Sequence, residues 1–322
     1  KEGEGPYGKF FDEILNDDKA GCECWEEAEG KLQEMAANKA LSKSGLEKKD
    51  IRYIVAGDLL GQLMASSFGL MKLEIPMFGI YGACSTMGES ISIASMLVDG
   101  GYADNILAIT SSHFASAEKQ FRFPLGYGSQ RKMASTWTVT GSGAVIISSE
   151  KMAQKANMSD KNKVHITGIT TGKIVDFGVK DSMNMGACMA PAAGNVIVQN
   201  LIDNGRKPEW YDKIITGDLG LVGKDILLDI TRSKGYDIAD RYMDCGIEIY
   251  SREQEIQAGG SGCGCSASML AGYIVKMLEK GTWQRVLFVP TGALLSPVSF
   301  NEGDSVPGIA HAVVFECSGE SQ

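Results

Sequence analysis

The chain has 322 residues, of which 44% are hydrophobic and 22% are charged, and its formal net charge at pH 7 is −9. This length and composition predict a globular protein with a filled core and about two structural units. The acidity and the absence of a basic stripe exclude nucleic acid as an expected partner. No apolar run approaches the ~20 residues of a membrane-spanning helix, and nothing resembles a secretory leader, so we expect neither a transmembrane segment nor a secretory signal.

The first half of the chain predicts alternating strands and helices. Apolar runs bounded by turns favour buried parallel strands, and an apolar stretch without a polar face favours a helix enclosed between two sheets. The expected elements are, in order, an extended arm with one short helix (1–19), a helix (22–41), two buried strands (51–56 and 77–80), the enclosed helix (85–98) and two further strands (105–110 and 143–147).

The second half repeats this order after a polar, charged stretch at 153–163, which we interpret as the boundary between a unit at 1–160 and a unit at 161–322. Residues 231–257 are extra relative to the first half, and we interpret them as a loop insertion that covers a cleft or an interface. The expected elements are strands at 164–170, 214–216, 285–290 and 310–316, with helices at 193–202 and 266–278.

One motif occurs in both halves. Val55–Leu59 reads Val-Ala-Gly-Asp-Leu and Ile215–Leu219 reads Ile-Thr-Gly-Asp-Leu, and each is followed by a small-residue turn that opens a helix, at Tyr81–Met87 and at Ser261–Ala267. Two such copies predict two α/β units related by a pseudo-twofold axis. A crevice where they join is the expected place for a ligand.

Cys84 lies in the first of these turns, between a strand and a helix. The N–H groups and dipole of a helix start favour an anion there, so we expect a lowered thiol pKa, an accessible thiolate and a nearby oxyanion hole. The alternative is a buried cysteine that acts as a small hydrophobic side chain. Pseudo-symmetry brings Asp218 and Cys263 of the second half toward Cys84, and a carboxylate beside a thiolate would raise the thiol pKa again. These three residues make a poor catalytic set.

The duplicated plan with Ala83-Cys84-Ser85 at the first enclosed helix resembles the thiolase superfamily, especially the type III ketoacyl synthases. The resemblance implies an α/β, thiolase-like fold of two pseudo-symmetric halves in a five-layered α-β-α-β-α arrangement, and a homodimer formed through the strand at 105–110. It also implies a Cys-His-Asn catalytic set. Here Cys84 matches the nucleophile, while Asp218 takes the histidine position and Cys263 the asparagine position, so one of the three residues is retained.

Longer motifs across nearly the whole chain resemble the stage V sporulation protein AD family of spore-forming bacteria. They include Phe78-Gly79-Ile80-Tyr81-Gly82-Ala83-Cys84-Ser85-Thr86, Thr138-Val139-Thr140-Gly141-Ser142-Gly143-Ala144-Val145 and Thr291-Gly292-Ala293-Leu294-Leu295-Ser296-Pro297. The resemblance implies a non-enzymatic subunit that binds dipicolinic acid, with calcium possible as a companion of the ligand and no cofactor of its own. It also implies a peripheral position at the spore inner membrane beside integral membrane subunits. Two alternatives stay open, namely a cysteine-dependent acyltransferase and a ligand-free scaffold.

The residues that we expect to contact dipicolinate offer N–H groups, hydroxyls or cations for its two carboxylates, or acids for calcium. Each also has a structural alternative: strand-end hydrogen bonds for His113, surface ion pairs or a subunit interface for Lys119 and Arg122, capping of loop N–H groups for the two aspartates, and packing for Cys263. No metal site of the protein's own is expected. The predicted ligand-binding set is Cys84, Ser85, Ser112, His113, Lys119, Arg122, Asp58, Asp218 and Cys263.

Overall fold

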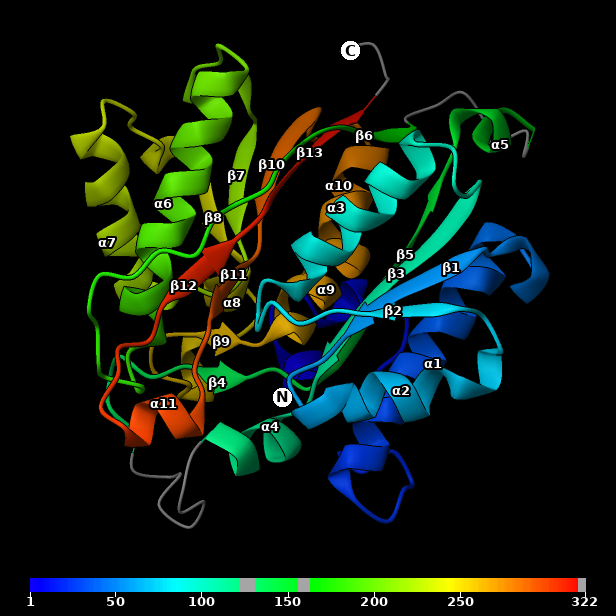
Figure 1. The fold of residues 1–322 in the computed structure, drawn as a ribbon, viewed down its shortest axis with the longest axis horizontal. Helices are drawn as coiled ribbons and strands as arrows, with labels where there is room; N and C mark the ends of the chain where they lie inside the picture. Colours follow the sequence, from blue (N-terminus) through cyan, green and yellow to red (C-terminus); the bar gives the residue numbers. More distant parts are fainter. Residues whose placement is uncertain (122–130, 156–162, 318–322) are drawn as a thin grey trace.

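The computed structural model describes residues 1–121, 131–155 and 163–317, which form two mixed β-sheets with helices between and outside them (Figure 1). In the first sheet β1 pairs in parallel with β2 and β3, and β3 pairs antiparallel with β5. Its strand order is β2 (Met77–Gly79), β1 (Tyr53–Gly57), β3 (Asn105–Ser112) and β5 (Gly141–Ser148).

The second sheet repeats this plan with one more strand. Here β7 pairs in parallel with β8 and β10, β10 pairs antiparallel with β13, and β6 adds antiparallel to the outer side of β13. Its strand order is β6 (Val164–Thr170), β13 (Ala312–Cys317), β10 (Arg285–Val289), β7 (Lys213–Thr216) and β8 (Tyr242–Asp244).

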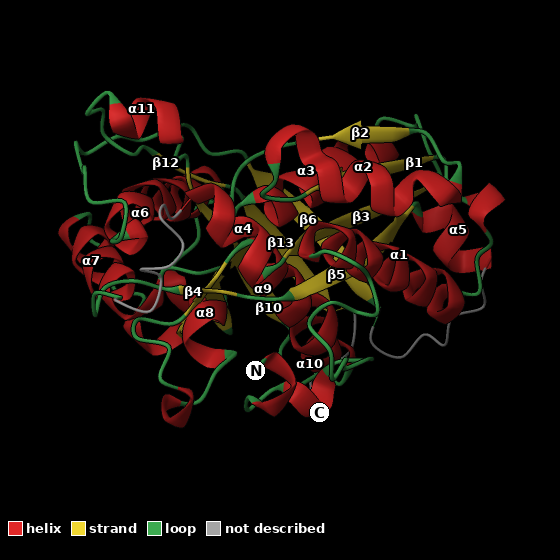
Figure 2. Ribbon diagram, turned by 90° about the horizontal axis from the view of Figure 1, so that it is seen from below, coloured by secondary structure: helices red, strands yellow, loops and turns green. Residues whose placement is uncertain are grey.

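The helices form three layers around the two sheets (Figure 2). The middle layer holds α3 (Thr86–Asp99) and the run α9 (Cys263–Met269), a π-helical turn (Leu270–Ile274) and α10 (Val275–Glu279). The outer layers hold α1 (Trp25–Ser44) and α2 (Met64–Leu70) on the first sheet, and α6 (Met185–Asp203) and α7 (Gly220–Ser233) on the second. Shorter elements are α4 (Phe114–Phe121), α5 (Glu150–Lys155), α8 (Cys245–Glu248), α11 (Pro297–Asn301), and the paired strands β4 (Trp137–Thr138) with β9 (Gly260–Ser261) and β11 (Thr291–Ala293) with β12 (Gly308–Ala310).

Side-chain alternation along the strands explains the five layers. In β1, Val55 packs into the central apolar cluster with α3, whereas Ile54 and Ala56 pack into the outer cluster with α1. In β10, Phe288 packs into the same central cluster, whereas Leu287 packs into the outer cluster with α6. Because both faces of each central strand are buried, the strands are apolar throughout, as the sequence predicts. The five-layered thiolase-like arrangement is confirmed.

Gly143 sets the distance between β5 and the middle layer. A Cβ atom built on it would lie 2.1 Å from the carbonyl oxygen of Ala267 in α9, so this residue lets the two backbones touch. The motif Thr140-Gly141-Ser142-Gly143 therefore packs a helix of the second half directly onto a strand of the first.

Three expectations about the first sheet and the insertion are wrong. The strand at 77–80 forms as β2, but its side chains are exposed because it is an edge strand. The strand at 105–110 forms as β3 between β1 and β5, so it has no free edge to pair with a second copy. Residues 231–257 are no loop insertion, since they contain β8, the counterpart of β2, and α8.

Other differences are small. The arm at 1–19 contains two short 3-10 helices, at Glu2–Glu4 and Gly8–Phe10, where one helix was expected. Among the described residues one helix, α6, has the length and apolar composition to cross a membrane, but 67% of it is buried inside the protein, as in a core helix.

Candidate functional site

Cys84 lies in a tight turn that carries the chain from β2 into α3. Ala83 before it has a positive φ of 50°, an uncommon conformation for a residue with a side chain. Two hydroxyls hold this turn in place, because Ser85 Oγ donates to the Gly82 carbonyl oxygen at 2.7 Å and Thr86 Oγ1 donates to that of Ala83 at 2.5 Å. The strained backbone therefore fixes the direction of the Cys84 side chain.

Asp218 of the second half lies opposite this turn, close enough to the Cys84 thiol to affect its pKa. Its hydrogen-bond partners are Thr291 Oγ1, which donates at 2.7 Å, and the backbone N–H of Gly262, which donates at 2.9 Å. Gly262 has a φ of 98°, which a residue with a side chain would rarely adopt. The carboxylate thus joins the ends of β7, β11 and α9 to the cysteine turn.

Burial raises the pKa of the Cys84 thiol well above its ordinary value, and the Asp218 carboxylate raises it further. The expected lowering by the helix start is therefore wrong, since desolvation outweighs it here. Burial also raises the pKa of Asp218, to about 7. Cys84 is consequently a neutral thiol at neutral pH, and the proton stays on sulfur because Asp218 is the weaker base.

Cys263 does not offer a donor to a ligand. Its thiol is fully buried and donates to the Ser111 carbonyl oxygen at 2.8 Å, and burial raises its pKa well above the ordinary range. This residue therefore binds the start of α9 to the end of β3. Cys84, Asp218 and Cys263 are brought together as the sequence predicts, in an arrangement that holds both thiols protonated.

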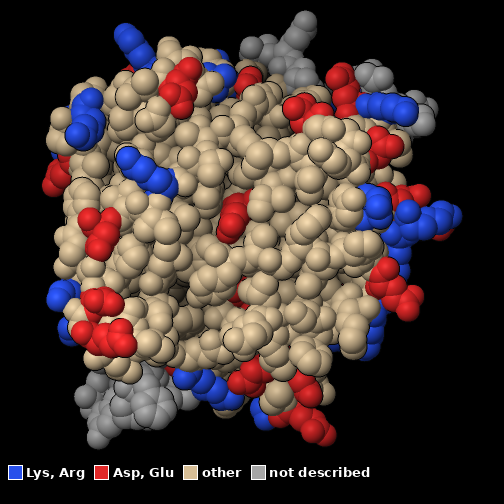
Figure 3. Space-filling model, viewed as in Figure 1, with Lys and Arg blue, Asp and Glu red and all other residues tan. Residues whose placement is uncertain are grey.

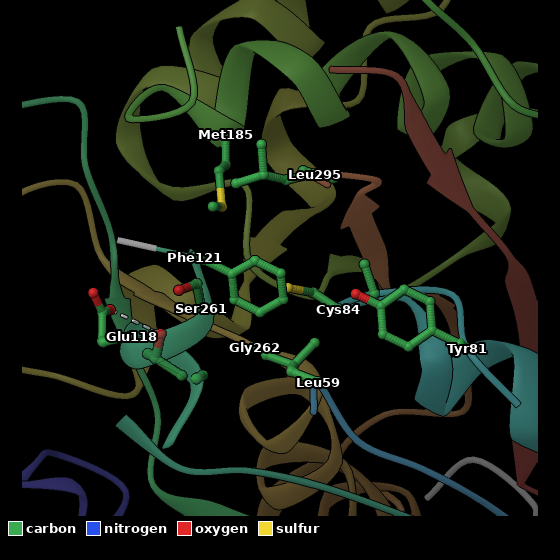
Figure 4. Close-up of a pocket in the computed structure, with 13 residues that line it drawn as sticks. Leu59, Tyr81, Cys84, Glu118, Phe121, Met185, Ser261, Gly262 and Leu295 are labelled. Carbon is green, nitrogen blue, oxygen red and sulfur yellow. Dashed lines mark hydrogen bonds between the residues drawn. The ribbon is translucent and has the colours of Figure 1, made fainter. Parts of the chain in front are cut away.

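A pocket opens directly above Cys84 (Figure 4). Its volume is about 30 Å³, room for about two water molecules. Its walls are mostly apolar and come from both halves: Leu59, Tyr81, Ala83, Cys84, Ala117, Glu118, Phe121, Thr138, Met185, Ser261, Gly262, Ala293 and Leu295.

Glu118 is the acidic wall of this pocket. Its carboxylate accepts from Thr138 Oγ1 at 3.1 Å and lies 3.4 Å from Nη2 of Arg131, with side chains only 2% and 3% exposed. The Arg131 guanidinium also stacks over the rings of Phe114 and Trp137, at 5.2 Å and 4.6 Å from their centroids. A buried ion pair with aromatic support thus closes one side of the site.

Glu118 was not predicted as a site residue, although its spacing in the sequence gives a signal. Phe114, Ala117, Glu118 and Phe121 stand at i, i+3, i+4 and i+7 of α4, so they share one face of that helix. Lys119, which was predicted instead, therefore faces away from the pocket and pairs with Glu26 on the surface at 2.8 Å.

The remaining predicted residues lie near the site without lining the pocket. His113 is buried, with Nε2 at 2.8 Å from the Asp18 carbonyl oxygen and Nδ1 accepting from the Ala115 N–H. Ser112 Oγ donates to the Val139 carbonyl oxygen, and Ser85 Oγ bonds within its own turn. Asp58 accepts from the N–H groups of Leu60 and Ser66, both at 2.8 Å, and so caps its loop. Arg122 lies outside the described residues.

A buried polar network lies beneath the first sheet and was not foreseen. Glu29 of α1 accepts from Ser111 Oγ at 3.0 Å and from Ser116 Oγ at 2.6 Å. Gln33 donates to Ser111 Oγ at 2.8 Å and to Ser66 Oγ at 2.9 Å, and Ser66 Oγ donates to Asp58 at 2.6 Å. Two buried acids are thereby linked by hydroxyl and amide groups. The burial of Glu29 could not be predicted from the sequence, because α1 also carries exposed glutamates such as Glu27.

Glu29 gives a pH-dependent stability that can be measured. Burial raises its pKa from 4.5 to about 8, with Asp58 adding to the rise. The folded protein holds this proton where the unfolded chain releases it, so its contribution to stability is fully present below pH 4.5 and is lost as pH rises through 8. Relative to Glu29→Gln, the wild-type chain should lose on the order of a few kcal/mol between about pH 5 and about pH 9.

Urea denaturation of both proteins at these two pH values measures that difference. Glu27→Gln, at an exposed position of the same helix, is the control and should track the wild-type chain at both. If the free energy of unfolding changes equally for wild type and Glu29→Gln between the two pH values, the Glu29 carboxyl is already ionised in the folded protein.

Among the described residues no group of three or more His, Cys, Asp or Glu side chains has an arrangement that could hold a metal ion. The apolar walls and the neutral thiol suit a small, flat, partly apolar ligand.

Solved structures of condensing enzymes resemble this chain, and at their low sequence identity the resemblance concerns the fold alone. The 3-oxoacyl-[acyl-carrier-protein] synthase III of Aquifex aeolicus VF5 superposes with a TM-score of 0.54 at 15% identity, covering 88% of this chain and 83% of that enzyme. OleA of Xanthomonas campestris, solved with bound lauric acid and lauroyl-CoA, superposes with a TM-score of 0.60 at 13% identity, covering 88% of this chain and 82% of OleA.

Sequence comparison is more specific. The Stage V sporulation protein AD of Bacillus subtilis (strain 168) is 45% identical over 319 residues, covering 99% of this chain and 91% of that protein. The family model of Stage V sporulation protein AD matches residues 1–316, a range that includes the cysteine turn, both sheets and all the walls of the pocket. The chain therefore belongs to the Stage V sporulation protein AD family, and it has a thiolase-like fold.

Proposed function

We propose that this chain is a non-enzymatic subunit that binds dipicolinic acid during sporulation and germination, in the pocket above Cys84. The proposal rests on the burial and protonation state of the Cys84 thiol. This thiol is buried and protonated beside Asp218, while the thiol of the second cysteine, Cys263, donates to a backbone carbonyl oxygen of β3. This pocket lies beside the cysteine that matches the nucleophile of condensing enzymes, but the thiol is not activated. Such a pocket favours ligand binding over covalent catalysis.

The pocket walls favour the calcium complex of dipicolinate over the free dianion. None of the described residues that line the pocket is Lys or Arg, whereas Glu118 is a wall and Asp218 lies behind Cys84. Because Arg131 balances the Glu118 carboxylate at 3.4 Å, this wall is close to neutral overall and suits a neutral ligand. The one-to-one calcium complex of dipicolinate is neutral and offers its metal to a carboxylate oxygen, whereas the free dianion is not neutral. The ring needs more room than the present 30 Å³, so Met185, Leu295 or Phe121 must move when it enters.

Calorimetric titration with dipicolinate, with and without calcium, tests this proposal. We expect saturable binding that is tighter with calcium. Met185→Trp should weaken it at least about tenfold, about 1.4 kcal/mol, because the indole fills the space above Cys84. Met183→Trp is the matched control, since Met183 is two residues earlier and does not line the pocket. Thermal unfolding of both variants checks that they fold.

An absence of heat at millimolar ligand, or equal effects of the two tryptophans, would remove this function for the isolated chain. The cysteine-dependent acyltransferase is the second candidate, since the fold neighbours are condensing enzymes. It predicts a covalent mass increase on incubation with an acyl thioester that Cys84→Ala abolishes. A ligand-free scaffold predicts neither result.

The expected membrane setting belongs to the same proposal. We place the chain at the inner spore membrane, beside integral subunits of the complex that moves dipicolinate. A homodimer also stays a prediction, and β2 is one of the two edge strands of the first sheet with which a second copy could pair. The surface in Figure 3 carries few charged side chains in its middle, where β2 and α3 lie toward the viewer. Exposed apolar side chains near this edge are Phe68, Met71, Met77, Phe78 and Tyr81.

A further inference from the structure

The short helix α4 lies between the pocket and the buried acid Glu29. One face of α4 carries Glu118 and Phe121, which line the pocket, and Phe121 lies beside Cys84 (Figure 4). Ser116 is on the other side of the helix, and its Oγ lies 2.6 Å from Oε2 of Glu29. The same helix therefore forms a wall of the pocket and a cover over the acid.

Ser116 can bond to Glu29 in both protonation states of the acid. Its Oγ lies within hydrogen-bond distance of Glu29 and also 3.2 Å from the carbonyl oxygen of His113. When Glu29 is ionised, the hydroxyl donates to the carboxylate. When Glu29 is protonated, the carboxyl donates to Ser116 Oγ, and the hydroxyl turns to the His113 carbonyl oxygen. The protonated acid thus binds α4 without leaving a buried charge.

The surroundings of Glu29 favour the protonated form. The side chain is fully buried, and burial together with the carboxylate of Asp58 raises its pKa to about 8. Lys119 of α4 does not offset this rise, because it pairs with Glu26 at 2.8 Å. The charged and titratable groups on the elements around Glu29 are two acids, a thiol, a histidine and this lysine: Asp58, Glu26, Cys263, His113 and Lys119.

We propose that the proton on Glu29 holds α4 against the pocket, and that loss of this proton frees the helix so that the pocket can widen. The pocket has room for about two water molecules, so a ring enters only after a wall has moved. Ser116 already touches Glu29 behind α4, which leaves no space for the helix to retreat with this contact intact. A movement of α4 that takes Phe121 away from Cys84 therefore breaks the bond to Glu29 and admits water.

The direction of the pH effect follows from this contact. In the open arrangement water replaces Ser116 as a donor and solvates the carboxyl further, so the pKa of Glu29 returns toward 4.5. The closed arrangement consequently binds the proton more tightly, and opening becomes easier as pH rises toward 8. Full hydration would raise the opening constant of α4 about tenfold between about pH 6.5 and about pH 8.

The consequence for dipicolinate rests on the proposed function. Both carboxyl groups of the ligand are already ionised at about pH 7, so the ligand itself brings no proton. Binding that moves α4 should release about half a proton or more per ligand in wild type than in Glu29→Gln. Calorimetry with calcium dipicolinate in two buffers of different ionisation enthalpy counts these protons. Glu27→Gln, at an exposed position of α1, should match the wild type.

Hydrogen–deuterium exchange of the ligand-free protein tests the movement of α4 independently of dipicolinate. The amide of Ala117 reports on α4, since it donates to the His113 carbonyl oxygen at 3.0 Å. Its protection factor should fall about tenfold from about pH 6.5 to about pH 8 in wild type and stay constant in Glu29→Gln. Glutamine copies the protonated acid, because it can donate to Ser116 and accept from Ser111, so the variant should fold.

The slowest amides of β3, which exchange by global unfolding, are the internal control. At about pH 8 Ala117 should exchange at least about tenfold faster than they do. The Glu118–Arg131 pair holds α4 in both proteins, so a difference between them belongs to Glu29. Equal rates at Ala117 and β3, or the same pH profile in Glu29→Gln, overturn the proposal. An absence of dipicolinate binding removes the proposed function alone, and the exchange profile then decides on α4.

Discussion

Replacement of Arg131 by methionine is expected to lower the free energy of unfolding by about 3–5 kcal/mol, because the Glu118 carboxylate would stay buried without the guanidinium beside it. The side chains of both residues are almost fully buried, at 3% and 2% exposure. Arg131 also loses its stacking on Phe114 and Trp137 in this variant. Urea denaturation followed by circular dichroism measures the change.

The neighbouring residue provides a matched control. Lys132 pairs with Asp181 at 3.0 Å, but the two side chains are 62% and 44% exposed, so Lys132→Met should cost less than about 1 kcal/mol. Adding Glu118→Gln to Arg131→Met should restore part of the stability, since it removes the buried charge that the first change left. Equal losses for Arg131→Met and Lys132→Met would show that burial does not strengthen the inner pair.

Gly143→Ala is expected to cost about 3 kcal/mol, at the upper end of ordinary overpacking, because the new methyl group meets backbone. Its Cβ would lie 2.1 Å from the carbonyl oxygen of Ala267, so β5 and α9 must move apart. The start of α9 carries Gly262 and Cys263, and its displacement should weaken dipicolinate binding as well. Urea denaturation and calorimetry measure the two effects.

Gly168→Ala is the control for this change. Gly168 lies in β6, also a strand, but its added Cβ would meet only the Val314 side chain, with Cγ2 at an ordinary contact distance of 3.6 Å. We therefore expect this variant to stay within about 0.5 kcal/mol of the wild-type chain. A similar small effect at Gly143 would mean that α9 can shift without loss.

Apolar patterning was enough to predict the layers. The runs around Val55, Leu107 and Leu287 are apolar on both faces, which only central strands of a covered sheet require. The enclosed helix at 85–98 was predicted for the same reason and lies within one residue of α3. Pattern could not rank the strands within a sheet, because the strand at 105–110 and an edge strand such as β2 are both short and apolar. The dimer contact expected at 105–110 came from the family resemblance, and the position of β3 between β1 and β5 overturns it.

The chemistry at Cys84 was harder to predict than its position. A helix start favours a thiolate, but burial decides the direction in which the pKa of the Cys84 thiol shifts. That burial depends on tertiary contacts of the turn with Asp218 and Gly262. Arg131 could not be placed because its partner Glu118 is a tertiary contact. Sequence spacing reports which side chains share a helix face, and it does not report which face turns toward a distant strand.

The central apolar cluster has a consequence for synthesis on the ribosome. Met87 and Ile91 of α3 pack there with Phe288 and Val313, which are made about two hundred residues later. When the first half has left the ribosome, α3 still lacks the surface that will cover it, so the nascent chain exposes an apolar helix until the last strands emerge. The halves are thus one cooperative folding unit, and the first half synthesised alone would be a substrate for chaperones.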